Sequence, residues 1–269
     1  MAELSGLRAL VTGGSSGIGA AIARELAARG ADLVLTARRK DALAAVAATC
    51  TGVKVDVIVG DLGKRDGAAE VWTAATAGGP VDIVINNAGF GAFHAFGTTE
   101  WERDAEMIEL NMTALVELSK RFVAGRTTRG YLVNIASIGA YQSVPNMAIY
   151  AASKAFVRNF TEALHDELAG TEVSATCICP GGTITPFHAA AGAGDYSWIA
   201  NAAMMSAERV ARISVKAMLR RKRTVIPGII NKLSCFGVRF VPRRIASWLS
   251  QRVLGRPKLV LPPRTGAAA

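Results

Sequence analysis

The sequence predicts an α/β fold built on one doubly wound parallel sheet, followed by a basic helical extension at the C-terminus. Short runs rich in Val, Ile and Leu alternate with Ala-rich helical stretches over most of the 269 residues. This alternation is typical of βαβ units around a sheet that is buried on both faces. Apolar residues make up 51% of the chain, which supplies a large core and excludes disorder over most of the length. A chain of this length suits a single domain of this class.

The expected strands and helices follow one another in strict alternation. The predicted strands cover residues 7–11, 32–36, 53–59, 81–85, 131–135 and 173–178. The predicted helices cover residues 17–29, 41–48, 65–77, 100–123 and 150–169. Right-handed crossovers between such strands place ligands at the carboxyl ends of the sheet.

Several classes of protein are excluded by composition. No apolar run approaches the ~18 residues that a membrane-spanning helix needs. The first residues lack a charged segment followed by an apolar one, so we expect no secretory leader and a cytoplasmic location. The cysteines show neither metal-ligand spacing nor disulfide density, so we expect no metal site and a packing role for Cys50, Cys177, Cys179 and Cys235.

A glycine-rich turn follows the first predicted strand. It reads Thr12-Gly13-Gly14-Ser15-Ser16-Gly17-Ile18-Gly19 and leads into a helix. Glycines let a backbone approach a pyrophosphate closely, and the N–H groups at the start of the helix attract that anion. A plain tight turn is the alternative, but the strand–turn–helix context favours dinucleotide binding, with contacts from Gly13, Ser15, Ser16, Gly17, Ile18 and Gly19.

The end of the second predicted strand bears on the choice of dinucleotide. An NAD site usually has an acidic residue here for the ribose hydroxyls, whereas this chain has Ala37 followed by Arg38 and Arg39. Two arginines suit the 2′-phosphate of NADP(H), which we favour over NAD(H), although solvated charges at a helix start are the alternative. Asp61, followed by Leu62, ends the third strand and can accept a hydrogen bond from the adenine amino group.

Tyr150 and Lys154 are four residues apart on a predicted helix and therefore share one face. An ammonium near a phenol favours the phenolate and lowers the pKa of the tyrosine from its usual ~10. A tyrosine tuned in this way can act as a general acid or base. Such a pair also occurs by chance on solvated helices, so its surroundings decide its meaning.

Those surroundings resemble the short-chain dehydrogenase/reductase family over roughly residues 5–187. Besides the glycine-rich turn and Asp61, the motifs that match in order are Asn86-Asn87-Ala88-Gly89, Asn111, Ser137, Tyr150-Ala-Ala-Ser-Lys154, and Pro180-Gly181 followed by Thr185. The resemblance implies a Rossmann fold and an oxidoreductase that interconverts alcohols and carbonyl compounds with a nicotinamide cofactor.

The resemblance also implies roles for four residues. Tyr150 donates a proton to the carbonyl oxygen in reduction, or removes the hydroxyl proton in oxidation. Lys154 lowers the pKa of Tyr150 and bonds the nicotinamide ribose, and Ser137 holds the substrate oxygen. Asn111 fixes a water that links Lys154 to solvent.

Further cofactor contacts are implied by the same resemblance. Asn87, Ala88 and Gly89 lie beside the adenosine ribose. Thr185 and the backbone near Thr183 hold the carboxamide, in a segment that starts at Pro180 and Gly181. Apolar side chains near this region can line a lipophilic substrate pocket around Ser137, with core packing as the alternative for Phe90, Val144, Phe187 and Trp198.

The C-terminal part departs from the family pattern. Residues 209–269 contain 15 Lys and Arg and no Asp or Glu. Residues 1–208, in contrast, contain 16 Lys and Arg and 21 Asp and Glu. Two apolar stripes at helical spacing lie in this part: Ile229, Leu233, Phe236 and Phe240, then Ile245, Trp248, Leu249 and Val253. Basic residues beside such stripes fit a helix lying on an anionic membrane, and packing on the domain or on a partner subunit is the alternative.

We therefore expect residues 1–226 to form the dinucleotide-binding and catalytic domain and residues 227–269 to form a basic amphipathic extension. The departure puts the usual tetramer of the family in doubt, and we expect a homodimer or homotetramer. Nucleic-acid binding is not expected, because the basic part has no recognised binding module.

The expected function is an NADP(H)-dependent oxidoreductase acting on a small lipophilic carbonyl or alcohol. One alternative is a 3-oxoacyl thioester reductase whose acidic carrier protein docks against the basic extension. Another is a non-catalytic protein that senses a nucleotide or associates with a membrane. The complete set of Asn111, Ser137, Tyr150 and Lys154 argues against the last of these.

Overall fold

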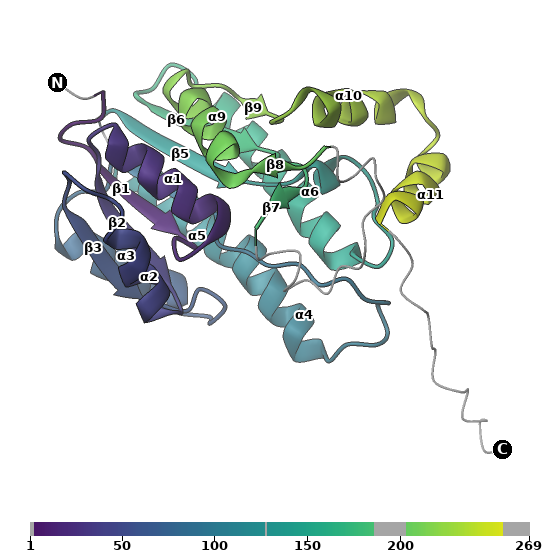
Figure 1. The fold of residues 1–269 in the computed structure, drawn as a ribbon, viewed down its shortest axis with the longest axis horizontal. Coiled ribbons are helices and arrows are strands. Elements are labelled where there is room, and N and C mark those ends of the chain that lie inside the picture. The colour runs from purple at the N-terminus through teal and green to yellow at the C-terminus, as the bar shows by residue number, and fades with distance from the viewer. Residues whose placement is uncertain (1–2, 127, 186–202, 255–269) are drawn as a thin grey trace.

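A seven-stranded parallel sheet runs through the molecule (Figure 1). The computed structural model describes residues 3–126, 128–185 and 203–254. The strands are β1 (Arg8–Thr12), β2 (Asp32–Ala37), β3 (Val55–Val59), β4 (Ile83–Asn86), β5 (Gly130–Ile135), β6 (Val173–Ile178) and β9 (Thr224–Val225). Their order in the sheet is β3-β2-β1-β4-β5-β6-β9, so the direction of winding reverses between β1 and β4. A reversal of this kind opens a crevice at the carboxyl ends of the two strands.

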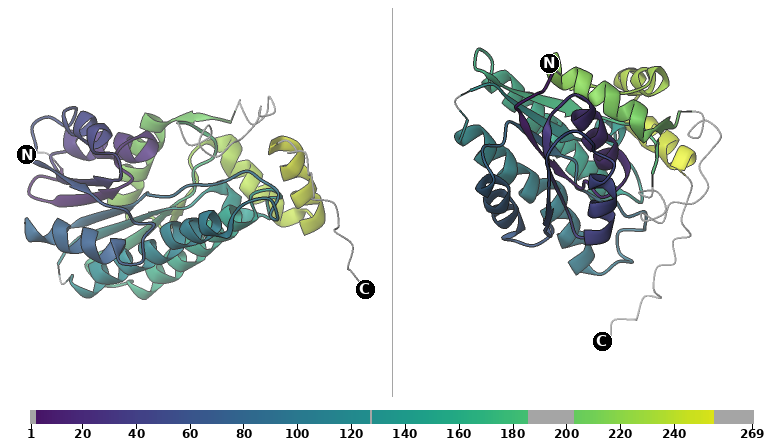
Figure 2. Two further views of the ribbon diagram at one scale, coloured as in Figure 1. Left: turned by 90° about the horizontal axis from the view of Figure 1, so that it is seen from below. Right: turned by 60° about the vertical axis from the view of Figure 1, so that its left-hand side comes forward.

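Helices cover both faces of the sheet, as the two views in Figure 2 show. One face carries α1 (Gly17–Ala28), α2 (Lys40–Ala47) and α9 (Ala207–Leu219), and the other carries α3 (Gly67–Ala77), α5 (Ala114–Ala124) and α6 (Ala148–Glu167). Neighbouring residues of one strand serve opposite cores, because side chains alternate along a strand. In β1, Val11 packs in the core beneath α1, and Leu10 packs in the core beneath α3 and α5.

The six predicted strands are confirmed, with ends that lie within two residues of those expected. Four of the predicted helices are confirmed with the same accuracy. The fifth, expected as one helix over 100–123, is divided into α4 (Trp101–Ile108), a π-helical turn (Glu109–Thr113) and α5. The short edge strand β9 and the helix α9 were not among the predicted elements.

The extension forms two helices, α10 (Ile229–Gly237) and α11 (Arg243–Leu254), joined through a 3-10 turn (Val238–Phe240). They lie at the end of the molecule toward which the strands point (Figure 1). They pack on the domain through Asn231, Cys235, Ala246 and Ser250, which are all buried. The apolar stripes expected from the sequence are exposed at every position whose burial is described, namely Ile229, Leu233, Phe236, Phe240, Ile245, Trp248 and Leu249. Whether the stripes contact the domain, a partner subunit or a membrane stays a prediction. The division of the chain at residue 226 stays a prediction.

A buried polar network joins the middle of the sheet to the helices behind it. Asn86 of β4 and Asn134 of β5 are paired in register, and Asn86 Nδ2 donates to Asn134 Oδ1 at 2.9 Å. Asn86 Nδ2 also donates to Ser119 Oγ of α5 at 3.1 Å, and Asn134 Nδ2 donates to Thr161 Oγ1 of α6 at 3.0 Å. All four side chains are buried, so each bond replaces a contact with water that folding removes.

Replacing Asn134 by alanine should lower the free energy of unfolding by roughly 2–4 kcal/mol, because the Asn86 amide and the Thr161 hydroxyl each lose a partner in a buried site. Urea denaturation measures the change. Asn159→Ala, which removes an exposed asparagine from α6, is the matched control and should stay within about 0.5 kcal/mol of the wild type. Equal stability of the two variants would contradict the importance of the network.

Candidate active site

The turn between β1 and α1 requires glycine at three of its positions. Gly13 and Gly17 have φ of 65° and 56°, which L-residues with a side chain rarely adopt. A Cβ on Gly19 would lie 2.3 Å from the Gly13 carbonyl oxygen and 2.4 Å from Asn87 Nδ2. The turn is therefore packed directly against the end of β4.

Thr12 and Asn87 hold these two segments together. Asn87 Nδ2 donates to the carbonyl oxygens of Thr12 at 2.9 Å and of Gly13 at 3.3 Å. In return, Thr12 Oγ1 accepts the backbone N–H groups of Asn87 and Ala88, both at 3.0 Å. The crevice at the reversal of winding is thus fixed by side-chain hydrogen bonds on both sides.

The N-terminus of α1 presents backbone donors to this crevice. Ser16 occupies the N-cap position in an extended conformation and makes no side-chain cap, so its hydroxyl does not bond the first N–H groups of the helix. The N-terminal N–H groups and the helix dipole together suit an anion such as a pyrophosphate. Ile18, in the first turn, packs against the core on the other side.

The two arginines after β2 have different partners. Arg39 donates to Ser16 Oγ at 3.2 Å and to Ser15 Oγ at 3.4 Å, which puts its positive charge over the glycine-rich turn. Arg38 instead donates to Glu106 Oε1 of α4 at 2.8 Å, in an exposed ion pair. At the end of β3, Asp61 Oδ1 accepts the N–H of Gly63 at 3.0 Å, and Leu62 is buried.

Three of the expected residues meet around Gly139. Ser137 caps the 3-10 turn Ile138–Tyr141 and accepts the Gly139 N–H at 3.1 Å. A Cβ on Gly139 would lie 3.5 Å from Ser137 Oγ, 3.9 Å from Tyr150 Cε1 and 4.0 Å from Val144 Cγ2. A hydroxyl, a phenol ring and an apolar side chain therefore surround one small residue, which the sequence did not single out.

Lys154 lies beneath this group and is buried. Its Nζ donates to the Ile135 carbonyl oxygen at 2.9 Å and is 5.9 Å from the centre of the Tyr150 ring. Burial lowers the pKa of Lys154 from its ordinary 10.5 to about 8. The ammonium is therefore close to its titration point in the neutral to weakly alkaline range.

Asn111 bonds the segment after β4 to α6. Its Oδ1 accepts the Phe90 N–H at 3.1 Å, and its Nδ2 donates to the Phe90 carbonyl at 3.0 Å and to Ser153 Oγ at 3.1 Å. Ser153 Oγ donates in turn to the Tyr150 carbonyl at 2.8 Å. Asn111 thus positions the helix that carries Tyr150, and the water relay expected for it stays a prediction.

Gly89 follows the end of β4 and lies next to both Asn111 and Lys154. A Cβ there would lie 2.8 Å from Asn111 Oδ1 and 3.4 Å from Lys154 Nζ. The Asn87-Ala88-Gly89 segment therefore runs from the glycine-rich turn to the buried lysine. This stretch of three residues connects the two halves of the site.

The segment after β6 closes another side of the crevice. Pro180 follows β6, and a Cβ on Gly181 would lie 2.4 Å from the Asn231 amide of α10. Thr183 belongs to β7 (Thr183–Ile184), which pairs in parallel with β8 (Met205–Ser206). A Cβ on Gly17 would lie 3.2 Å from Thr185 Cγ2, so this segment reaches the start of α1.

Besides Ser137, two of the four apolar substrate contacts expected from the sequence are described. Val144 lies beside Ser137 and Tyr150, and Phe90 is held by Asn111 through its backbone. Phe187 and Trp198 lie outside the described residues. The buried Asn231 was missed by the sequence analysis, although an amide inside an otherwise apolar helical repeat was a usable signal.

Comparison with known proteins places the chain in a family. A family model for short chain dehydrogenases matches residues 8–196. An uncharacterized oxidoreductase of Myxococcus xanthus (strain DK1622) is 38% identical over 187 residues, which cover 67% of this chain and 74% of that protein.

Two solved structures extend the likeness over most of the chain. A short-chain dehydrogenase from Sphingobium yanoikuyae in complex with NADPH is 32% identical, with a TM-score of 0.75 over 87% of this chain and 94% of that one. A structure from work on 7beta-hydroxysteroid dehydrogenase stereoselectivity is 26% identical, with a TM-score of 0.82 over 92% and 98% of the two chains. The protein therefore belongs to the short chain dehydrogenase family, and it is an oxidoreductase acting on alcohol and carbonyl groups.

Proposed function

We propose that this enzyme uses NADPH to reduce the carbonyl group of a lipophilic substrate to an alcohol. The observation that carries the proposal is the meeting of Ser137, Tyr150 and Val144 around Gly139, with the Lys154 ammonium 5.9 Å from the Tyr150 ring centre. The NADPH complex of the related dehydrogenase supports the cofactor. The likeness to a hydroxysteroid dehydrogenase supports the lipophilic substrate.

The catalytic roles follow from the chemistry of these groups. The Ser137 hydroxyl donates a hydrogen bond to the substrate carbonyl oxygen and stabilises the negative charge that grows on it. A bound nicotinamide would supply the hydride for the carbonyl carbon. The Tyr150 hydroxyl gives its proton to the same oxygen, which becomes the alcohol, and Lys154 stabilises the phenolate that remains.

The residues around the glycine-rich turn fit a dinucleotide. The start of α1 has no side-chain cap, and Gly13 before it and Gly17 and Gly19 within it leave its backbone open to a pyrophosphate. Arg39, Ser15 and Ser16 form a basic, hydroxyl-rich corner for the 2′-phosphate, and Arg38 can join it by leaving Glu106. The remaining contacts in this proposal are Ile18, Asp61, Leu62, Asn87, Ala88 and Gly89 for the adenosine end, and Pro180, Gly181, Thr183 and Thr185 for the nicotinamide end.

A 3-oxoacyl thioester presents a carbonyl that the same groups could reduce. Thioesters of this kind should therefore be assayed beside free ketones. If the enzyme reduced only the thioesters, they and not lipophilic ketones would be its substrate class. The homodimer or homotetramer and the cytoplasmic location expected from the sequence stay predictions. Among the described helices, none has both the length and the hydrophobicity needed to cross a bilayer.

Replacing Tyr150 by phenylalanine should lower kcat by roughly 10²–10⁴-fold, because the proton donor is lost and the ring is kept. The assay follows NADPH oxidation with a panel of steroid, retinoid and long-chain ketones. Tyr141→Phe, which removes another half-buried hydroxyl from the 3-10 turn next to the site, should leave kcat within about twofold. Undiminished turnover by Tyr150→Phe would overturn the proposed mechanism.

Replacing Arg39 by glutamine should weaken NADPH binding by about tenfold or more and leave NADH binding nearly unchanged, since a charge-assisted bond to the 2′-phosphate is lost. Arg38→Gln tests the second arginine separately, and Arg24→Gln removes an exposed arginine of α1 as the control. Fluorescence titration with both dinucleotides gives the Kd values. If NADH binds the wild type as tightly as NADPH, the proposed cofactor preference is incorrect.

The lowered pKa of Lys154 predicts how stability depends on pH. Below about pH 8 the folded chain carries a buried ammonium, a cost that disappears as pH rises through 8 toward the unfolded value of 10.5. The unfolding free energy of the wild type should therefore rise relative to that of Lys154→Met, by at most about 1.4 kcal/mol per pH unit. Urea denaturation across this range measures it, and exposed Lys120→Met is the control. Parallel pH curves for wild type and Lys154→Met would refute the lowered pKa.

A further inference from the structure

The extension exposes an unusual amount of apolar surface. Eight of the fourteen large hydrophobic side chains that are exposed in the described residues lie between 229 and 249, although this is a small part of the chain. Their exposed fractions run from 45% to 73%. We call this surface the outer face; its main apolar members are Ile229, Leu233, Phe236, Phe240, Trp248 and Leu249. Apolar patches of this kind mark sites of interaction.

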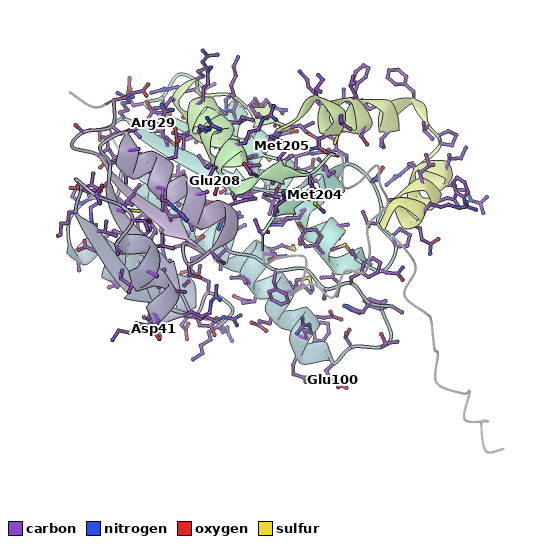
Figure 3. All side chains as sticks on the ribbon, viewed as in Figure 1. Arg29, Asp41, Glu100, Met204, Met205 and Glu208 are labelled. Atoms are coloured by element: carbon purple, nitrogen blue, oxygen red, sulfur yellow. The ribbon has the colours of Figure 1, made fainter. Side chains whose placement is uncertain are left out.

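Hydrogen bonds on the domain-facing side of α10 and α11 orient the outer face toward solvent. Asn231 Nδ2 donates to the Pro227 carbonyl at 3.0 Å, and its amide packs against Gly181. Ser250 Oγ donates to the Ser143 carbonyl at 3.1 Å. Small or polar residues thus anchor both helices, and the large apolar ones face solvent. Figure 3 shows ring-bearing side chains standing on the outer side of α10, away from the sheet.

Cations surround the apolar members, and acids are missing from this part of the sequence. Lys232, Arg239, Arg243, Arg244 and Arg252 are all exposed, and residues 209–269 contain no Asp or Glu. The Arg252 guanidinium lies 4.6 Å from the centre of the Trp248 ring. Arg243 and Arg244 line an open hollow with Ser143 and Ser247, where a phosphate could accept their hydrogen bonds.

Aromatic and aliphatic side chains beside arginines match the chemistry of an anionic bilayer surface. There the apolar groups enter the boundary between headgroups and acyl chains, and the cations bind lipid phosphates. A second copy of this face would meet it with like charges, which oppose association. An acidic protein would satisfy the cations and would leave the aliphatic side chains of α10 without a partner.

We infer that the outer face docks on a membrane that contains anionic phospholipid. Docking would bring the substrate side of the active site to the bilayer, because α11 is bonded to Ser143, next to Val144. The docking itself is independent of which carbonyl compound the enzyme reduces.

Co-sedimentation of the full chain with vesicles tests the inference. The wild type should bind vesicles of equal parts phosphatidylcholine and phosphatidylglycerol far more than vesicles of phosphatidylcholine alone. Arg243→Gln with Arg244→Gln should weaken this binding by about tenfold or more, since each cation near the surface contributes to it. Phe240→Ser should weaken it severalfold by removing an apolar anchor. NADPH titration and thermal melting establish that each variant is folded.

Two matched controls separate docking from general effects of charge and exposure. Arg212→Gln with Lys216→Gln removes the same charge from the exposed side of α9, and Trp101→Ser removes another exposed aromatic residue at the start of α4. Both should bind vesicles like the wild type. Absence of wild-type binding, or an equal loss in the α9 pair, would overturn the inference. So would a Phe240→Ser variant that loses self-association in analytical ultracentrifugation and keeps full vesicle binding, because the face would then belong to a second copy.

Discussion

The hydrogen bonds between Thr12 and Asn87 are the constraint on which the rest of the site depends. They join the end of β1 to the end of β4, the two strands between which the winding of the sheet reverses. Backbone donors of Asn87 and Ala88 and carbonyls of Thr12 and Gly13 are all satisfied within this contact. The crevice therefore has its shape before any ligand enters, and a ligand need not supply the energy to form it.

From this contact a series of packing contacts and hydrogen bonds leads to the proposed proton donor. Gly89 follows Asn87 and packs against Asn111, which bonds Phe90 and Ser153, and Ser153 bonds the backbone of Tyr150. The π-helical turn puts Asn111 at the centre of this series as a fully buried amide. Hydrogen-bond networks of this kind hold side chains from different helices and strands in one fixed arrangement.

The fold could be predicted from the sequence because the buried strands are apolar runs and the helices between them begin or end near glycines. The π-helical turn could not, since the helical pattern of 100–123 is continuous and nothing in it signals that Asn111, within the turn, bonds the backbone of Phe90. The sequence pointed to both Arg38 and Arg39, but it could not assign a partner to either one. Adjacent side chains at a strand end point in different directions, so the tertiary structure decides that Arg38 bonds Glu106 and Arg39 bonds Ser16. Helical periodicity likewise revealed α10 and α11 without revealing which side faces the domain, because Asn231 and Ser250 anchor them in place of large apolar residues.

The contact between Asn231 and Gly181 has a thermodynamic consequence. It joins the outer helices to the segment after β6, so a ligand that displaces either partner also alters the other. Thermodynamic linkage makes such an effect reciprocal. If binding at α10 changed the affinity of the crevice for its ligand by some factor, binding of that ligand would change the affinity at α10 by the same factor. The amide of Asn231 and the backbone of Gly181 form the direct contact between α10 and the segment that borders the crevice, so any such coupling would pass through them.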